Sequence, residues 1–160
     1  VDVVDRSISD PAVRQALHCK IGSLLQEQHG LPGERSYEVF HHLARGGRLR
    51  SAVKNGLNAA RRLARSFSIE KAILVLDELL GVLDVSEDQL THLQVLREKT
   101  SYCVWLREYE RAQECIQQLL SEGGPELDPP LRVELQIGES EIYRLAGEPH
   151  RALKIQSKCY

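Results

Sequence analysis

The sequence predicts an all-α protein of antiparallel helical hairpins, with about eight helices. The helix-favouring residues Leu, Ala, Arg and Glu dominate the composition, whereas aromatic residues make up only 5% of it. No segment shows a sustained alternation of apolar and polar residues with β-branched side chains, so we expect no sheet. Short breaks containing glycine, proline or serine separate the helical stretches, and such connections make consecutive helices antiparallel neighbours.

Four helices are expected in the first half of the chain. Residues 9–10 (SD) offer a helix cap ahead of Pro11, which suits a first turn, and apolar residues then recur at helical spacing. The stretch HGLPG at 29–33 ends this helix because glycine and proline both interrupt helices. Breaks at 46–47 and 66–68 divide the remainder into helices expected at 34–45, 49–66 and 69–83.

Four more helices are expected in the second half. Ser86 is the expected N-cap of the fifth helix, with Gln89 at the matching position of a capping box. The longest loop, residues 122–130, contains two glycines and three prolines. Near the end of the chain, Gly147 ends one helix and Pro149 begins the last. These four helices are expected at 88–106, 109–120, 131–145 and from 149 onward.

A local pattern recurs at four of the breaks. Each copy has a break, a bulky or spacer residue, two polar residues, an alanine and a large aliphatic residue. A small side chain at the alanine position lets two helices of a hairpin approach closely. Twenty residues separate the first two alanines, and forty separate each later pair. The aligned alanines, which we expect to pack between helices, are Ala52, Ala72, Ala112 and Ala152.

This pattern resembles the tetratricopeptide repeat (TPR), whose second helix begins with a Gly-Asp-Tyr-x-x-Ala-like sequence. The copy with Tyr143, Gly147 and Ala152 is the best match. The resemblance implies TPR-like hairpins in a right-handed superhelical array over 34–160, with residues 1–33 forming a helix that leads into it. The twenty-residue interval requires the helix at 49–66 to serve two copies.

A second resemblance covers residues 16–80, with the stretches ALHCKIG and VFHHLARGG. It resembles the start of the helical-repeat arm of large bacterial multidomain signalling ATPases and regulators. That resemblance implies a regulatory arm whose catalytic domains lie elsewhere. The sequence contains no methionine and its last helix is short. We therefore expect a fragment of a longer protein, with the last repeat truncated and with Leu153 and Ile155 under-covered.

The sequence contains no recognisable catalytic or nucleotide-binding motif: no phosphate-binding loop, dinucleotide fingerprint, nucleophile elbow or HExxH zinc motif. The pairs His18-Cys19 and His41-His42 fall in adjacent expected helices. Neighbouring residues on a helix point about 100° apart, so neither pair chelates a metal easily. We therefore expect no metal, no cofactor and no enzymatic activity in this segment.

A row of basic residues marks the helix at 49–66. No acidic residue occurs between Glu38 and Glu70, and the row occupies one arc of about 80° on the helix, with apolar residues on the other side. Three interpretations stay open, namely a solvated face, a contact for an acidic protein or peptide, and a nucleic-acid or phosphate surface. Nucleic acid is the least favoured because single-strand binders interleave stacking aromatics, and only Phe67 borders the row. The arc contains Arg50, Lys54, Asn58, Arg61 and Arg65, and its four cations form the row.

In TPR arrays the first helices of successive hairpins line a concave surface. The resemblance therefore implies a set of partner-binding positions, whose cations would suit carboxylates of a partner. Trp105 is either an anchor for that partner or, as for most lone tryptophans of helical domains, a core residue. Ser101 and Glu141 are further positions on this expected surface. The expected partner-binding residues are Tyr37, His41, Arg45, Arg50, Lys54, Arg61, Arg65, Arg97, Trp105 and Arg144.

The expected function is a non-catalytic protein-interaction scaffold, part of a regulatory or sensor arm. Its partner would be an acidic protein or peptide, or another domain of the same polypeptide. The alternatives are a self-associating structural module and a nucleic-acid-binding regulator that uses the basic row. The four cysteines form no C-x-x-C pair, so free buried thiols and a cytoplasmic location are expected, without membrane insertion.

Overall fold

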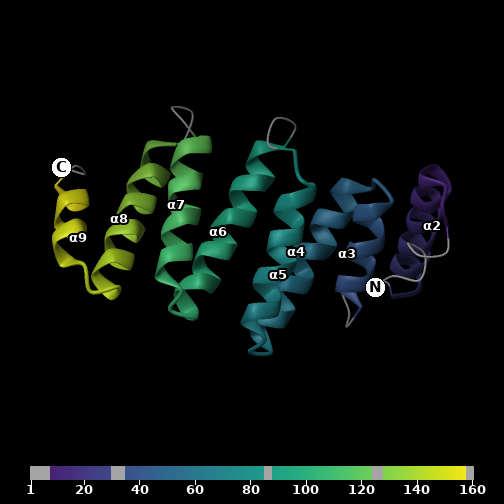
Figure 1. Cartoon of the computed structure of the whole chain (residues 1–160), viewed down its shortest axis with the longest axis horizontal. Helices are drawn as coiled ribbons and strands as arrows, with labels where there is room; N and C mark the ends of the chain where they lie inside the picture. The colour runs from purple at the N-terminus through teal and green to yellow at the C-terminus, as the bar shows by residue number, and fades with distance from the viewer. Residues whose placement is uncertain (1–7, 30–34, 85–87, 124–127, 158–160) are drawn as a thin grey trace. The chain divides into compact units, whose positions relative to one another are not determined.

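The computed structural model describes residues 8–29, 35–84, 88–123 and 128–157 (Figure 1). Within these ranges every regular element is an α-helix, as the sequence predicts. The chain divides into two compact units, unit 1 at Val1–Leu83 and unit 2 at Asp84–Tyr160. Among the described residues, no helix combines the length and the apolar character that crossing a bilayer requires.

Unit 1 consists of four helices that pack in chain order, α2 on α3, α3 on α4 and α4 on α5. The helix that the sequence places ahead of the repeats, within 1–33, is thus joined to the rest of the unit as α2. The core residues Phe40, Leu43, Ile73, Leu76 and Leu79 are almost completely buried. The helices are α2 (Pro11–His29), α3 (Ser36–Arg45), α4 (Leu49–Arg65) and α5 (Ile69–Val82).

Glycine permits two of these helix contacts. A Cβ atom on Gly46 would lie 2.5 Å from the backbone nitrogen of Cys19, so the end of α3 meets the α2 backbone directly. A Cβ atom on Gly56 would lie 2.8 Å from Cδ1 of Leu79, so α4 packs directly on that side chain of α5. A side chain at 46 would push the α2 backbone away, whereas one at 56 would displace the Leu79 side chain.

Unit 2 also has four helices in sequence, with α6 packed on α7, α7 on α8 and α8 on α9. Its core contains Leu96, Cys103, Ile116, Leu119 and Ile142. The last helix is covered on one side only, with Ala152 buried and Leu153 exposed. The helices are α6 (Gln89–Trp105), α7 (Tyr109–Gly123), α8 (Pro129–Leu145) and α9 (Pro149–Gln156).

Three helix ends in unit 2 differ from the sequence prediction. The side chain of Asp88, not Ser86, caps α6 by accepting a hydrogen bond from the backbone N–H of Thr91, and Ser86 lies outside the described residues. Helix α8 begins at Pro129, two residues early, because proline lacks only an N–H that a first turn leaves unbonded. Helix α7 continues to Gly123, which is buried.

The chain adopts the same turn at each of the four breaks where the sequence pattern recurs. At the last copy, the N–H of Gly147 donates to the carbonyl of Arg144 at 3.2 Å, and the N–H of Glu148 donates to the carbonyl of Tyr143 at 2.8 Å. This pair of bonds is the Schellman motif, in which one residue adopts a left-handed conformation. The same two bonds recur at the other three breaks. The left-handed residues are Gly47 (φ 73°), Phe67 (φ 60°), Arg107 (φ 60°) and Gly147 (φ 82°).

The aligned alanines follow these left-handed residues by five positions and are all buried. In each, the N–H donates to the carbonyl four residues earlier, which closes the first turn of the second helix. Helix α4 begins after one such turn and ends at the next, which accounts for the twenty-residue interval. It is the second helix of the pair α3–α4 and the first of the pair α4–α5.

Candidate functional site

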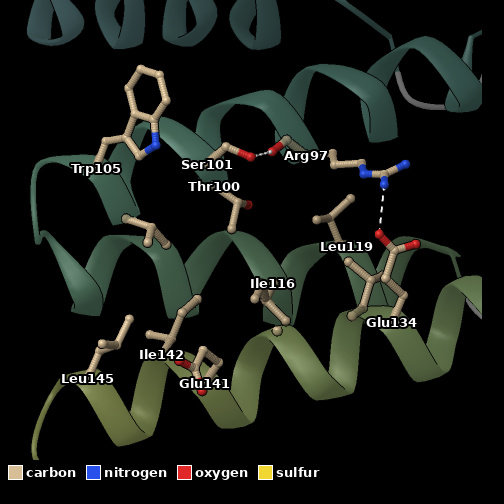
Figure 2. A pocket seen from close by; sticks show the side chains of 13 residues that line it. Arg97, Thr100, Ser101, Trp105, Ile116, Leu119, Glu134, Glu141, Ile142 and Leu145 are labelled. Carbon is tan, nitrogen blue, oxygen red and sulfur yellow. Dashed lines mark hydrogen bonds and ion pairs between the residues drawn. The ribbon is translucent and has the colours of Figure 1, made fainter.

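A groove in unit 2 lies between α6 and α8, above α7, and has a volume of about 370 Å³ (Figure 2). Its base is apolar and is formed by Ile116 and Leu119 of α7, with Leu135 and Ile142 of α8 beside them. In Figure 2, α6 and α8 flank α7, so side chains from three helices converge on one space. Helical turns placed in this way leave a site for apolar side chains of a partner.

Gly138 keeps the middle of the groove empty. It lies inside α8, where glycine is less favourable than alanine for the helix. A Cβ atom at this position would meet only Cδ1 of Ile116, at an ordinary contact distance of 3.9 Å. A larger side chain at 138 would therefore project into the groove without displacing the backbone.

An ion pair bridges one end of the groove. Nη2 of Arg97 on α6 donates to Oε1 of Glu134 on α8 at 2.8 Å, and both side chains are well exposed. Figure 2 shows this pair reaching across from the two helices. The nearby hydroxyls bond to their own helix, because Ser101 donates to the carbonyl of Arg97 and Thr100 to that of Leu96.

Trp105 lies at the other end of the groove and is 66% exposed. Its ring centroid is 6.3 Å from that of Tyr102, and Leu145 is exposed on the facing helix. The side chains of Trp105 and Leu145 mark the end away from Arg97 in Figure 2. The tryptophan is therefore a surface residue of the groove, so its interpretation as a core residue is wrong; that it anchors a partner stays a prediction.

The remaining charges at the rim are also paired. Glu141 lines the groove and accepts a hydrogen bond from Nε of Arg144 at 2.8 Å. This hydrogen bond lowers the pKa of Glu141 and raises the pKa of Arg144. Arg97 lines the groove, Arg144 pairs with the groove residue Glu141, and each of these arginines therefore already has a carboxylate partner. The groove therefore carries little net charge.

Unit 1 has a cavity of its own, of about 610 Å³, formed by α3, α4 and α5. Tyr37 of α3, Leu63 of α4 and Leu74 of α5 line it. The hydroxyl of Tyr37 donates to Oε1 of Glu78 at 3.1 Å. Burial raises the pKa of Tyr37, and the hydrogen bond and negative charge of Glu78 raise it further.

The histidines of unit 1 lie close together. Nδ1 of His18 on α2 is 2.9 Å from Nδ1 of His42 on α3, and the His41 ring contacts both rings edge to face. His18 is buried, so this pair joins α2 to α3. His41 also lies beside Tyr37, at a centroid distance of 6.2 Å. Within the described ranges, no set of three or more His, Cys, Asp or Glu residues is arranged to hold a metal ion.

The basic row of α4 lies on the surface of unit 1. Arg50, Lys54 and Arg65 are exposed, and Arg61 is half-buried. Arg45, at the end of α3, is exposed as well. None of these side chains lines either of the two cavities described above. Of the expected partner-binding residues, Arg97 and Trp105 line the unit 2 groove, Tyr37 lines the unit 1 cavity, and the others line neither.

Solved structures with the same fold exist. TPR-like repeats of a putative kinesin light chain from Podosopora anserina match with a TM-score of 0.59 and 14% sequence identity, and the match covers 95% of this chain and 75% of that one. A form of that protein with one substitution gives the same values. BtubC (BKLC) from P. vanneervenii matches with a TM-score of 0.65 and 16% identity, covering 96% of this chain and 64% of that one. This chain therefore spans less than two thirds of BtubC. No family model and no curated protein matches the sequence.

These likenesses confirm the predicted TPR-like helical-repeat fold. At 14–16% identity they establish the fold alone. The resemblance of residues 16–80 to the arms of signalling ATPases stays a prediction.

Several residues that form the groove were not predicted from the sequence. Gly138, Glu134 and Leu145 were read only as parts of a helix. A glycine inside a helix is a detectable signal, because it weakens the helix without ending it. The helical spacing of Glu134, Gly138, Glu141 and Leu145 also places them on one face. The α6 side of the groove, forty residues away, could not be paired with them from sequence.

Two cysteines of unit 2 are buried in its core. These are Cys103 of α6 and Cys115 of α7, and neither forms a disulfide. A hydrogen bond to Cys115, together with burial, raises the pKa of Cys103. The Cys103 thiol is therefore protonated at neutral pH, and only the thiolate is a strong nucleophile.

Proposed function

We propose that this protein is a non-catalytic interaction scaffold that binds a short segment of a partner protein in the groove between α6 and α8. The observation that carries the proposal is an exposed tryptophan at the end of an apolar groove. Tryptophan is enriched among the residues that contribute most to protein interfaces, because it offers a large and rigid contact area. Because Trp105 is exposed, its ring is accessible to a partner.

The dimensions of the groove favour a short amphipathic helix. Arg97 and Trp105 are eight residues apart on α6, which corresponds to about 12 Å of helix. Two apolar residues four apart on a partner helix span about 6 Å and fit between these limits. Because the rim cations are paired with Glu134 and Glu141, the groove demands no particular charge from the partner.

The chemistry of the groove supports binding in place of catalysis. Its hydroxyls, on Thr100 and Ser101, are engaged with backbone carbonyls of α6. Its charged groups are exposed and paired, so they lack the burial that tunes an acid, a base or a nucleophile. Apolar contact is what this lining offers.

The lone tryptophan allows a direct test. Peptides selected from a random phage-displayed library on the purified protein would be titrated while the emission of Trp105 is recorded. We expect peptides with apolar residues four apart, and we expect binding to move the emission to shorter wavelengths. A Gly138→Leu variant should weaken these peptides by at least about tenfold, since the leucine fills the groove.

The matched control is Gly81→Leu, which makes the same change at a helical glycine of α5 with nothing within 4 Å. This variant should bind like the wild type. Trp105→Ala removes the only tryptophan, so its binding is followed by the anisotropy of a labelled peptide; it should be weaker than that of the wild type, with unchanged helical content. Equal binding of the selected peptides to Gly138→Leu and wild type, with unchanged emission, would refute the groove. A concentration-dependent dimer blocked by Gly138→Leu would instead support self-association.

We also propose a regulatory role in the cytoplasm. The resemblance of residues 16–80 to arms of signalling regulators supports the role, and the buried cysteines Cys103 and Cys115, which form no disulfide, suit a reducing compartment. If the role is correct, Gly138→Leu in the natural gene should alter a cellular output while the abundance of the protein stays constant. Loss of output through reduced abundance alone would contradict it.

A further inference from the structure

Three exposed cations of α4 have no ion-pair partner among the described residues. They are Arg50, Lys54 and Arg65, whereas Arg61, in the same row, already has an interaction partner. No acidic residue occurs between Glu38 and Glu70 to neutralise them. Other exposed arginines of the chain are paired with a glutamate. These pairs are Arg35–Glu38, Arg97–Glu134, Arg111–Glu108, Arg144–Glu141 and Arg151–Glu148.

The cations of α4 form a row along the helix. From Arg50 to Arg65 the row covers fifteen helical positions, or about 22 Å, within one arc of the helix. Arg50 and Lys54 are four residues apart, as are Arg61 and Arg65, which places each pair about 6 Å apart along the axis. Most of the rest of the helix is occupied, because Ala52 and other small apolar residues are buried against the neighbouring helices.

Phe67 follows the row, two residues after Arg65 at the end of α4. It is 89% exposed, and its φ of 60° is a conformation that disfavours side chains. The equivalent turns after α3 and α8 have glycine at this position. An exposed phenylalanine therefore replaces the residue that the turn prefers, and no packing within the described structure accounts for it.

We propose that the α4 row and Phe67 together bind an acidic polypeptide segment of a partner protein. Arg50, Lys54 and Arg65 would bind carboxylates, and Phe67 would contact one apolar side chain at the end of the segment. In an extended chain, alternate residues on one side are about 6.6 Å apart, close to the spacing of about 6 Å within each cation pair. This surface belongs to unit 1, so it is separate from the groove of unit 2 and goes beyond the function proposed above.

Two other polyanions fit the face less well. Binding of single-stranded nucleic acid depends on aromatic side chains interleaved with the cations, and Phe67 is at the end of the row. Binding in a membrane interface needs an apolar helix face to insert, and the apolar residues of α4 are already buried. A segment with carboxylates and a single apolar residue matches what the face presents.

Fluorescence anisotropy of a labelled peptide of alternating glutamate and serine tests the proposal on the whole chain. We expect binding that weakens steeply with salt, because the contact is electrostatic. Lys54→Glu with Arg65→Glu should weaken it by at least about tenfold. Lys20→Glu with Lys154→Glu makes the same change in net charge at exposed positions outside the row, and it should leave affinity within about twofold.

The role of Phe67 has its own readout. Adding a terminal leucine to the peptide should raise its affinity, and Phe67→Gly should abolish that gain without altering the salt dependence. The same substitution removes the left-handed strain, so it should also raise the unfolding midpoint. If the Phe67→Gly variant is more stable than the wild type and still loses the affinity gained from the terminal leucine, misfolding cannot explain the loss.

Opposite results would overturn the proposal. These are no binding of the acidic peptide, equal binding by the Lys54→Glu/Arg65→Glu variant, or stronger binding of a single-stranded oligonucleotide or of phosphatidylserine vesicles than of the peptide. The Gly138→Leu variant should bind the acidic peptide like the wild type. The groove and the α4 face can therefore fail independently.

Discussion

The left-handed residue of each shared turn should control stability in a predictable direction. Arg107 has a φ of 60° in the turn between α6 and α7, whereas Gly147 has a φ of 82° in the equivalent turn between α8 and α9. Exchanging the residue types therefore gives two opposite perturbations of one backbone geometry in the same unit: Arg107→Gly should stabilise unit 2, and Gly147→Ala should destabilise it.

The magnitudes follow from the surroundings of each residue. A left-handed conformation costs an L-residue about 1–2 kcal/mol, and the greater freedom of glycine in the unfolded chain offsets part of this. Arg107→Gly should thus gain about 0.5–1 kcal/mol, since the arginine is exposed. Nothing lies within 4 Å of a Cβ atom at Gly147, so the loss of about 1 kcal/mol expected for Gly147→Ala is purely conformational.

Urea unfolding followed by far-ultraviolet circular dichroism measures both effects. A change of about 1 kcal/mol corresponds to a thermal shift of about 4–8 °C in a unit of this size. The midpoints should move in opposite directions with the slope of the transition unchanged. A lower midpoint for Arg107→Gly, or an unchanged midpoint for Gly147→Ala, would refute the conclusion that one strained turn recurs along the chain.

Further variants test packing, helix propensity and ionisation. Gly46→Ala should destabilise the protein in urea by about 1–3 kcal/mol, because the new Cβ atom would lie 2.5 Å from the backbone nitrogen of Cys19; a cost near zero would contradict that contact. Gly81→Ala should stabilise it by about 0.5–1 kcal/mol in the same assay, because the position is helical and open; destabilisation would mean that the site is not open. Since the fold raises the pKa of Tyr37 above its ordinary 10.0, the stability that this group contributes is complete below pH 10 and is lost as pH rises through the raised pKa. Glu78→Gln should lower the Tyr37 pKa in an alkaline absorbance titration, and an unchanged titration would exclude Glu78 as a cause.

The sequence predicted the helices because their signals are local. The aligned alanines located four turns, and each alanine is five residues after a left-handed residue. Two of those left-handed residues, Phe67 and Arg107, are not glycine, so their residue type does not mark a turn in the sequence. The alanine and the residues around it were therefore more informative than the turn itself.

The candidate site was harder to predict because its parts are distant in sequence. Trp105 could equally have been buried until α8 was placed opposite it. The pairing of Arg97 with Glu134 depends on the same placement, and it removes a cation that the sequence suggested was available. The contact of His18 with His42 likewise depends on how closely α2 meets α3, which Gly46 decides.

The shared turn also bears on how far such sequences can diverge. Its two hydrogen bonds join main-chain atoms only, so no particular side chain is required to make them. Replacing the preferred glycine costs about 1 kcal/mol at each turn, which a helical protein can recover with one better-packed core residue. Mutations can therefore erase the glycines one by one over evolutionary time while the hairpin geometry survives. A lineage of this kind would lose its recognisable sequence signature long before it lost its architecture.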